Sequence, residues 1–239
     1  TEDDYFKQFQ LLADQTPKAG TMIYNEEDKV AKKVCSKEVV DILKLPYKTP
    51  KYEVKDSIFY LKDDKKKYAL KVFGKHNLQN MMGAKALLDR IGINESMFYE
   101  AIQSFEGTAK RGALVKENST VSVYNDFAHA PSKLQATVEA IKELHPKRKL
   151  TACFELHTFS SLNKDFLPQY NGKFKKADEA IVYFNPSLVA SKNLPAISPE
   201  DILSAFGRKD IKVMTSNQEL KDLLEAKSWD NEDLLMMSS

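Results

Sequence analysis

The carboxyl-terminal half of the sequence alternates strand-like and helix-like segments, and this pattern constrains the fold more than any other feature. Short apolar runs typical of strands occur at "TVSVYND", "KLTACFE", "EAIVYF", "IKVMT" and "DLLMM". A helix is expected over residues 131–144, because apolar positions recur there on one face, at Leu134, Val138, Ile141 and Leu144. Strands that alternate with helices of about 10 to 14 residues are typical of βαβ units. The pattern predicts an α/β fold: a Rossmann-like, doubly wound and mostly parallel sheet.

Local capping signals mark the ends of two later helices in this half. Ser198 followed by Pro199 predicts a helix start, and Gly207 predicts the end of the same helix. Ser216, with Glu219 three residues later, has the spacing of a capping box. These signals place the helices between strands, as a βαβ chain requires.

The first half of the chain has a less regular pattern. Helices are expected over residues 5–13, 30–43, 77–91 and 95–104, the third of them ending at Gly92. The segment "YEVKDSIFYLKDDKKKYALKVFG" alternates apolar and polar residues around a polar tip, which predicts a β-hairpin. The basic, glycine-containing turn "FEGTAKRG" is the expected domain boundary, dividing the chain into residues 1–107 and 108–239.

Composition excludes several classes of protein. Lys plus Arg number 36 against 34 for Asp plus Glu, so the net charge of +2 favours neither a nucleic-acid nor a membrane partner. Cys35 and Cys153 predict no disulfide framework. The sequence has no long apolar span and no secretion leader, so a cytoplasmic location is expected. Because it begins without Met and ends on a strand, we expect a fragment of a longer protein.

Polar side chains follow two consecutive strands of the predicted sheet. Asn125, Asp126 and His129 follow the first strand, and Glu155 and His157 follow the second. Ligands gather at the carboxyl ends of strands in open α/β sheets, so these side chains predict a site. Each group also has a plain alternative, a cap at a strand-to-helix turn or the hydroxyl-rich loop "HTFSS". The occurrence of both groups at one edge favours the site.

Two further segments carry candidate binding residues. In "FGKHNLQN", Asn77 and Asn80 place two carboxamides one helical turn apart, a donor and acceptor pair suited to the edge of adenine. The alternative is a simple helix cap. In "FEGTAKRG", Arg111 offers a planar fork suited to phosphate, although basic loop residues are usually only solvated.

Several motifs are absent from the 239 residues. The sequence contains no GxxxxGK[ST] phosphate loop, and no GxGxxG follows the first strand of the second half. It contains no HExxH, CxxC or GxSxG, and the four histidines have no metal-ligand spacing, so no metal site is predicted.

Taken in order, "FGKHNLQN", "FEGTAKRG", "YNDFAHAPSKLQATVEAI" and "FELHTFSS" resemble the Mur ligase family, which builds the peptide of bacterial cell-wall precursors. Members have a uridine-nucleotide domain, a central ATPase domain with a P-loop and a carboxyl-terminal Rossmann-like domain. The resemblance implies that residues 1–107 are the second half of the central domain and that residues 108–239 are the last domain.

The resemblance also implies the chemistry and the residues that take part. The expected reaction is ATP-dependent amide formation, in which a carboxylate of UDP-N-acetylmuramate is phosphorylated and an amino acid or peptide attacks the acyl phosphate. The cofactors are ATP and Mg²⁺, with the magnesium ligands mostly in the missing part. The implied residues are His76, Asn77 and Asn80 for adenine, Arg111 for ribose and phosphates, Asp126 for the nucleotide, His129 near the reacting groups, and His157, Thr158 and Ser160 for the incoming amine.

The motifs leave the amine open. "DFAHAP" is similar to members that attach a ready-made peptide during murein recycling, whereas His157 is similar to the loop of members that add alanine. Asn125 and Ala130 depart from the usual Asp and His of that motif. Because the P-loop half is missing, the 239 residues alone are expected to be inactive. A non-catalytic nucleotide- or peptide-binding module is the alternative from another class.

Overall fold

The structure is a computed structural model that describes residues 2–36, 41–63, 66–108 and 111–238. It contains two compact units. Unit 1 comprises Thr1–Lys71 and Lys75–Phe105, and unit 2 comprises Val72–Gly74 and Glu106–Ser239.

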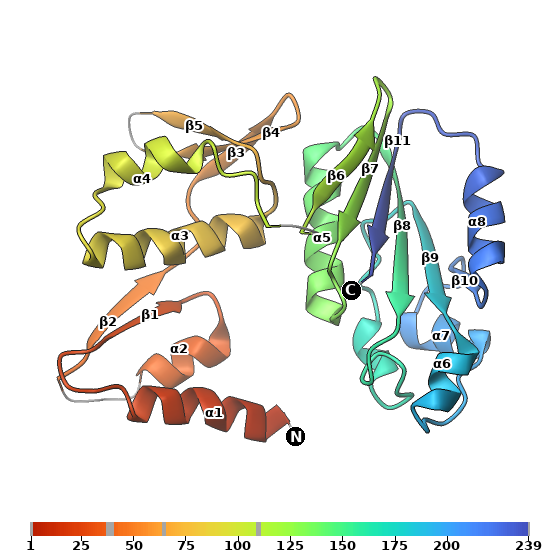
Figure 1. Cartoon of the computed structure of the whole chain (residues 1–239), viewed down its shortest axis with the longest axis horizontal. Coiled ribbons are helices and arrows are strands. Elements are labelled where there is room, and N and C mark those ends of the chain that lie inside the picture. Colours follow the sequence, from red (N-terminus) through yellow and green to blue (C-terminus); the bar gives the residue numbers. More distant parts are fainter. Residues whose placement is uncertain (1, 37–40, 64–65, 109–110, 239) are drawn as a thin grey trace. The chain divides into compact units, whose positions relative to one another are not determined.

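Unit 2 is built on a six-stranded sheet with the strand order β10-β9-β8-β11-β7-β6 (Figure 1). Its strands are β6 (Ala113–Glu117), β7 (Val121–Asp126), β8 (Lys149–Leu156), β9 (Glu179–Phe184), β10 (Lys212–Met214) and β11 (Glu232–Met237). Every neighbouring pair is parallel except β6 with β7. This is the mixed α/β fold with a parallel-dominated sheet that the sequence predicts. The antiparallel edge strand β6 was not predicted.

The helices of unit 2 begin and end close to their sequence signals. They are α5 (Pro131–Leu144), the 3₁₀ turn η1 (Leu167–Tyr170), α6 (Pro186–Ser191), α7 (Pro199–Phe206) and α8 (Asn217–Glu225). Ser216 forms the capping box that its spacing predicts, Ser198 caps α7 and also forms a capping box with Asp201, and Gly207 ends α7 with a left-handed φ of 66°. Helix α5 packs against β8 and β11, whereas α7 and α8 pack against β10. Helix α6 was not expected from the sequence.

The last strand, β11, lies in the middle of the sheet rather than at its edge. It pairs with β7 on one side and with β8 on the other, so that Met237 is opposite both Asp126 and Phe154. Strands β7 and β8 follow one another in the sequence, yet β11 lies between them in the sheet. The carboxyl ends of three strands therefore meet side by side, which positions the site described below.

The described residues of unit 1 form two small sheets and four helices. Its helices are α1 (Glu2–Asp14), α2 (Lys29–Ser36), α3 (Lys75–Arg90) and α4 (Glu95–Ile102). Strands β1 (Thr21–Asn25) and β2 (Leu43–Tyr47) form a parallel pair, and β3 (Tyr52–Lys55), β4 (Ile58–Lys62) and β5 (Lys67–Leu70) form an antiparallel sheet. Helix α3 packs closely on β2, since a Cβ on Gly83 would lie 3.1 Å from the Tyr47 ring.

Two expectations for unit 1 were wrong in part. The helix expected over residues 30–43 ends at Ser36, and Leu43 instead begins β2, because it pairs with Thr21 of β1. Residues 37–40 of that range lie outside the described residues. The expected hairpin is real but carries a third strand, because Asp56 and Ser57 both have positive φ (51° and 60°) and form a second tight turn. Part of the "KDDKKK" tip also lies outside the described residues.

Candidate functional site

The carboxyl edge of the unit 2 sheet joins the ends of β7, β11 and β8. The backbone N–H of Ser238, just after β11, donates to the carbonyl of Asp126 at 3.1 Å. The Ser238 hydroxyl donates to the carboxylate of Glu155 on β8. We call this region the carboxyl edge; it contains Asp126, His129, Glu155, His157 and Ser238.

Asp126 is the most heavily bonded side chain of the carboxyl edge. It is 7% exposed, and its Oδ2 accepts from the N–H of Gly112 at 2.7 Å. Its Oδ1 accepts from the N–H of Ala128 at 2.8 Å and from the Thr137 hydroxyl at 3.2 Å. The carboxylate thus ties the Gly112 turn, its own turn and helix α5 together. A contact between Asp126 and nucleotide remains a prediction.

Arg111 lies beside this anchor. Its neighbour Gly112 has a φ of 63°, and a Cβ on Gly112 would lie 2.8 Å from the Phe73 ring, so only glycine fits this turn. The backbone N–H of Arg111 donates to the Thr108 carbonyl at 3.1 Å. The Arg111 side chain is exposed and makes no hydrogen bond or ion pair with the described residues. The fixed backbone therefore presents a guanidinium that can bind an anion.

His129 is held in the turn that precedes α5. Its Nδ1 lies 3.0 Å from the carbonyl oxygen of Phe127, and the two rings meet edge to face. A carbonyl can only accept, so Nδ1 is the protonated nitrogen of the neutral ring. Within the described part of the chain, no group bonds to Nε2. The arrangement leaves Nε2 as the basic atom of this imidazole.

Glu155 and His157 follow β8 at the same edge. Their Oε2 and Nδ1 atoms are 3.9 Å apart, and both side chains are half-buried. The imidazole and the carboxylate are thus close enough to interact electrostatically. The structure therefore brings together the two carboxylates and the two imidazoles that the sequence placed on separate strand ends.

The loop after β8 is closed by its own hydroxyl groups. Ser161 is 1% exposed, and its hydroxyl accepts from the N–H of Thr158 at 3.0 Å and from the Thr158 hydroxyl at 2.8 Å. Ser160 and Phe159 remain exposed, and Lys192 places its Nζ 5.5 Å above the Phe159 ring. Thr158 thus shapes the loop, while Ser160 faces solvent. Their predicted role in binding the amine remains a prediction.

The predicted adenine residues lie in unit 1, at the start of helix α3. His76 and Asn77 are in its first turn, and Asn80 is exposed one turn later. Because the helix begins at Lys75, Asn77 is not its cap. Their role in binding adenine remains a prediction.

A hydrogen-bonded carboxylate links α3 to both parallel strands of unit 1. Glu27, just after β1, accepts from the N–H of Thr49 at 2.8 Å and from the Gln79 amide at 2.9 Å, and it also accepts from the Thr49 hydroxyl. These bonds, with the Thr49 hydroxyl first, lower the pKa of Glu27 to about 2. Sequence reasoning missed this cluster, since its members are distant in the chain.

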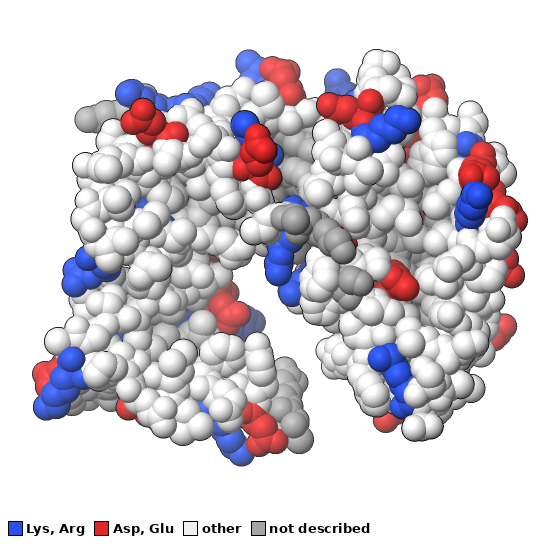
Figure 2. Space-filling view, in the orientation of Figure 1, with Lys and Arg blue, Asp and Glu red and all other residues white. Residues whose placement is uncertain are grey.

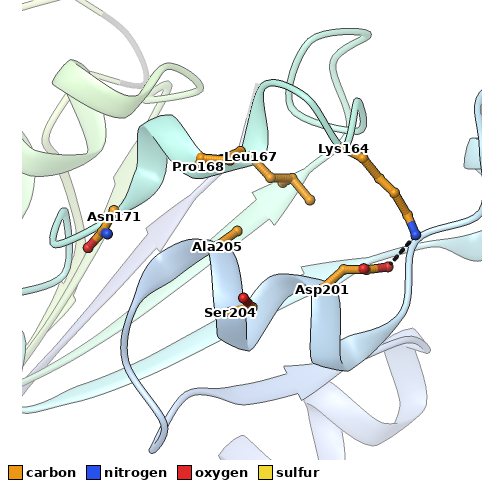
Figure 3. A pocket seen from close by; sticks show the side chains of 7 residues that line it. All are labelled: Lys164, Leu167, Pro168, Asn171, Asp201, Ser204 and Ala205. Atoms are coloured by element: carbon orange, nitrogen blue, oxygen red, sulfur yellow. Dashed lines mark ion pairs between the residues drawn. The ribbon is translucent and has the colours of Figure 1, made fainter.

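A separate hollow of about 350 Å³ lies between η1 and α7 (Figure 3). The ion pair between Lys164 and Asp201, 2.8 Å long, closes one side of it. Its lining residues are Lys164, Leu167, Pro168, Asn171, Asp201, Ser204 and Ala205. None of the predicted site residues lines this hollow. On the face shown in Figure 2, acidic and basic side chains of the described residues are interspersed.

Among the described residues, no group of three or more His, Cys, Asp and Glu side chains is placed to hold a metal ion. None of the helices found there is both long and apolar enough to cross a membrane.

The fold defines unit 2 as an α/β domain with a parallel-dominated, Rossmann-like sheet. The family model described as "Mur ligase, glutamate ligase domain" matches residues 110–239, more than half of the sequence. The chain therefore belongs to the Mur ligase family.

Curated and solved relatives extend the likeness over both units. UDP-N-acetylmuramate–L-alanine ligase of Lactobacillus delbrueckii subsp. bulgaricus is 28% identical over 240 residues, covering 94% of this chain and 52% of the relative. The solved L-alanine ligase of Thermotoga maritima has a TM-score of 0.68 at 18% identity, and the murein peptide ligase of Psychrobacter arcticus has 0.62 at 19%. They cover 100% and 99% of this chain and 52% of each relative.

A third solved relative was determined with a nucleotide. The MurF ligase of Thermotoga maritima, in complex with ADP, has a TM-score of 0.64 at 14% identity over 92% of this chain and 50% of its own. At these identities the solved structures show the shared fold. The chain spans about half the length of the relatives it matches.

Four residues that organise the carboxyl edge were missed by sequence reasoning: Gly112, Thr137, Tyr170 and Ser238. Thr137 carried a signal, since it is a polar residue on the apolar face of α5, where it is 3% exposed. Gly112 and Tyr170 act through contacts with residues 14 and 41 positions away. No local pattern marks such contacts.

Proposed function

We propose that the chain is part of an ATP-dependent ligase that joins an amino acid or peptide to UDP-N-acetylmuramate. The observation that carries the proposal is the carboxyl edge of unit 2, where three strand ends bring Asp126, Glu155, His129 and His157 together. Membership of the Mur ligase family and the names of the relatives support the same activity.

The residues present are suited to a bound nucleotide. Arg111 offers an exposed guanidinium on a backbone fixed by Gly112 and Asp126, which fits a phosphate group. His76, Asn77 and Asn80 offer ring and carboxamide groups at one helix start, which fits a purine. ATP, when bound, supplies the phosphoryl group that activates the muramyl carboxylate. Magnesium belongs to this proposal, with its ligands mostly outside the chain.

His129 takes the catalytic role in unit 2. Its Nδ1–H donates to Phe127, so its Nε2 can accept the proton that an incoming ammonium group must lose before nitrogen attacks. Glu155 and His157 lie at the same edge and orient or deprotonate the same amine substrate. The loop with Thr158 and Ser160 binds the rest of the amine. Asp126 holds the turn on which both Arg111 and His129 depend.

Two amines are candidates, each with its own support. L-Alanine is favoured by the curated relatives, which carry the name UDP-N-acetylmuramate–L-alanine ligase. The tripeptide L-alanyl-γ-D-glutamyl-meso-diaminopimelate, the amine of a murein peptide ligase, is favoured by Phe127 and Ala128 in the "DFAHAP" turn. Both reactions place an ammonium group beside His129.

We further propose that unit 1 is the second half of the central ATPase domain and unit 2 the carboxyl-terminal domain. The parallel pair β1–β2 supports this, because parallel sheets are normally buried on both faces and all five residues of β1 are only half-buried. The missing part of the same polypeptide is then the partner of unit 1. A cytoplasmic location follows from the same proposal, since nucleotide-linked substrates are used there.

The test is a drop-out assay on the natural-length protein. ATP-dependent phosphate release should require UDP-N-acetylmuramate together with either L-alanine or the tripeptide, and the required amine names the member of the family. The 239 residues alone should release no phosphate, because they contain no P-loop. Release that is independent of both muramyl substrate and amine would contradict the ligase, and an absence of release under every condition would favour the non-catalytic binding module.

A further inference from the structure

Tyr170 lies 41 residues after His129 in the sequence but contacts the turn that holds His129. Its hydroxyl donates to the backbone carbonyl of His129 at 3.0 Å. Tyr170 is the last residue of η1 and is 0% exposed. Burial raises the pKa of its phenol above the ordinary range, so the hydroxyl keeps its proton and remains a donor.

The Tyr170 ring is fixed by aromatic neighbours. It stacks on Phe206 of α7 with centroids 5.0 Å apart and an interplanar angle of 9°. Phe154 of β8 and Phe166 also contact the ring, with centroids at 5.3 Å and 6.0 Å. Packing against three other rings restricts the orientation of the Tyr170 ring, so its hydroxyl donates to the His129 carbonyl from a fixed position.

The two carbonyl groups of the turn have linked roles. The Phe127 carbonyl accepts from the His129 ring, and the His129 carbonyl accepts from Tyr170. The ring bond closes over only two residues, so it depends on the backbone angles of Phe127, Ala128 and His129. Pinning the His129 carbonyl limits those angles. Asp126 pins the other end of the turn through the Ala128 N–H.

We propose that Tyr170 is a positioning residue that holds His129 in the Nδ1–H tautomer and so leaves Nε2 as the proton acceptor. A neutral imidazole in water prefers its proton on Nε2, and the opposite tautomer persists only where Nδ1 has a fixed acceptor. Tyr170 supplies that fixity without touching the ring. The tautomer is a property of this chain alone; its catalytic meaning rests on the proposed function.

The direct test is nitrogen NMR of the histidine rings, which distinguishes the two tautomers at a pH where the ring is neutral. The protein has four histidines, so His129 is assigned by the signal lost in His129→Asn. Wild-type His129 should show its proton on Nδ1. In Tyr170→Phe the signal should move toward the Nε2–H tautomer, because the ring packing is kept and only the hydroxyl is removed.

Tyr124→Phe is the matched control. Tyr124 is also buried, at 4% exposure, and packs edge to face on Phe73, but its hydroxyl does not bond to the 126–131 turn within the described residues. This variant should leave the His129 tautomer unchanged. An Nε2–H ring in the wild type overturns the proposal without any variant. A folded Tyr170→Phe with an unchanged tautomer overturns the role of Tyr170.

A second readout connects the tautomer to activity. In the natural-length protein with its amine and UDP-N-acetylmuramate, Tyr170→Phe should lower kcat about tenfold while leaving KM for ATP unchanged. If no ligase activity is found in the wild type, the proposed function fails while the NMR result still decides the tautomer. A tautomer shift with unchanged kcat overturns the link between Tyr170 and catalysis.

Discussion

The two edges of the unit 2 sheet both carry charged groups but arrange them in opposite ways. At the amino edge, where the parallel strands begin, buried acids meet cations. At the carboxyl edge, acids meet backbone N–H groups, hydroxyls and imidazoles. The difference separates an edge closed by ion pairs from the edge on which the proposed function rests.

The amino edge is organised by two successive residues of β11. Glu232 is 3% exposed and pairs with Lys227 at 2.7 Å, while Asp233 is 1% exposed and pairs with Arg148 at 3.0 Å and His145 at 2.7 Å. Successive residues of a strand point to opposite faces, so the sheet has an ion cluster on each face. Burial alone would lower the pKa of Lys227, but its bonds to two glutamates outweigh this effect and raise it.

The carboxyl edge differs in how its acids are bonded. Among the described residues, neither Asp126 nor Glu155 forms an ion pair with a lysine or arginine. The Arg111 side chain is exposed, and the His129 Nε2 has no partner in the same set. The Arg111 guanidinium and the His129 Nε2 therefore keep hydrogen-bonding capacity within the described residues.

The largest effect is expected when the amino edge is broken at Asp233. Asp233→Ala leaves Arg148 and His145 without their buried partner, which should lower the free energy of unfolding by about 3 kcal/mol. Urea denaturation of the 239-residue chain measures the loss. Asp230→Ala, an exposed acid three residues earlier, is the control and should change stability by less than about 0.5 kcal/mol. Equal losses in both variants would contradict a stabilising role of the buried ion cluster at the amino edge.

His129→Ala should give the opposite profile. The side chain is only half-buried, so stability should change by less than about 1 kcal/mol. Ligation by the natural-length protein should fall about 10²- to 10⁴-fold, the usual share of general acid–base catalysis. Rates measured with saturating ATP and both muramyl and amine substrates test this. A loss of stability without loss of rate would return His129 to a structural role.

Gly112→Ala tests how Arg111 is held at the carboxyl edge. The alanine would have to adopt the positive φ of Gly112, and its Cβ would lie 2.8 Å from the Phe73 ring. The free energy of unfolding should therefore fall by about 1–3 kcal/mol. KM for ATP should rise, because the Gly112 N–H anchors the segment to Asp126. Gly172→Ala is the matched control, with a φ of 71° and no atom within 4 Å of its Cβ. If both variants raise KM equally, the hydrogen bond between Gly112 and Asp126 does not contribute to ATP binding.

The smallest effect is expected at Glu27 in unit 1. Its folded pKa of about 2 lies below the ordinary 4.5, so its contribution to stability is present above pH 4.5 and is lost as pH falls through about 2. The stability difference between wild type and Glu27→Gln should therefore be largest near neutral pH and vanish in acid. Because Glu27 is exposed, the difference should stay below about 1 kcal/mol. A difference that grows in acid would contradict the sign.

Sequence patterns predicted most elements of unit 2, because strand runs, Pro131 and the two capping boxes are local signals. They did not predict that β11 enters between β7 and β8, since strand order depends on pairing between distant segments. In unit 1, β2 was misread for the same reason: "LKLPY" has weak alternation, and its strand state comes from its parallel partner β1.

The sequence predicted which residues lie at the candidate site, but only part of how they are bonded to one another. Two acid and imidazole pairs at successive strand ends indicated an edge, and the structure brings them together. The bonds of Asp126 to Gly112 and Thr137 were not predictable, because an acid at a turn looks the same whether it binds a ligand or the backbone. A motif names the residues at an edge, whereas the fold decides which of them have hydrogen-bonding capacity left.

The most direct test compares one variant from each edge in the same ligation assay. Ser122→Ala removes a 1% exposed hydroxyl that accepts from Arg148 at the amino edge, and His129→Ala removes the imidazole of the carboxyl edge. With both natural-length variants folded, Ser122→Ala should keep the wild-type rate of ATP-dependent phosphate release, while His129→Ala should lose at least about 10²-fold. A His129→Ala variant as active as Ser122→Ala would contradict the account.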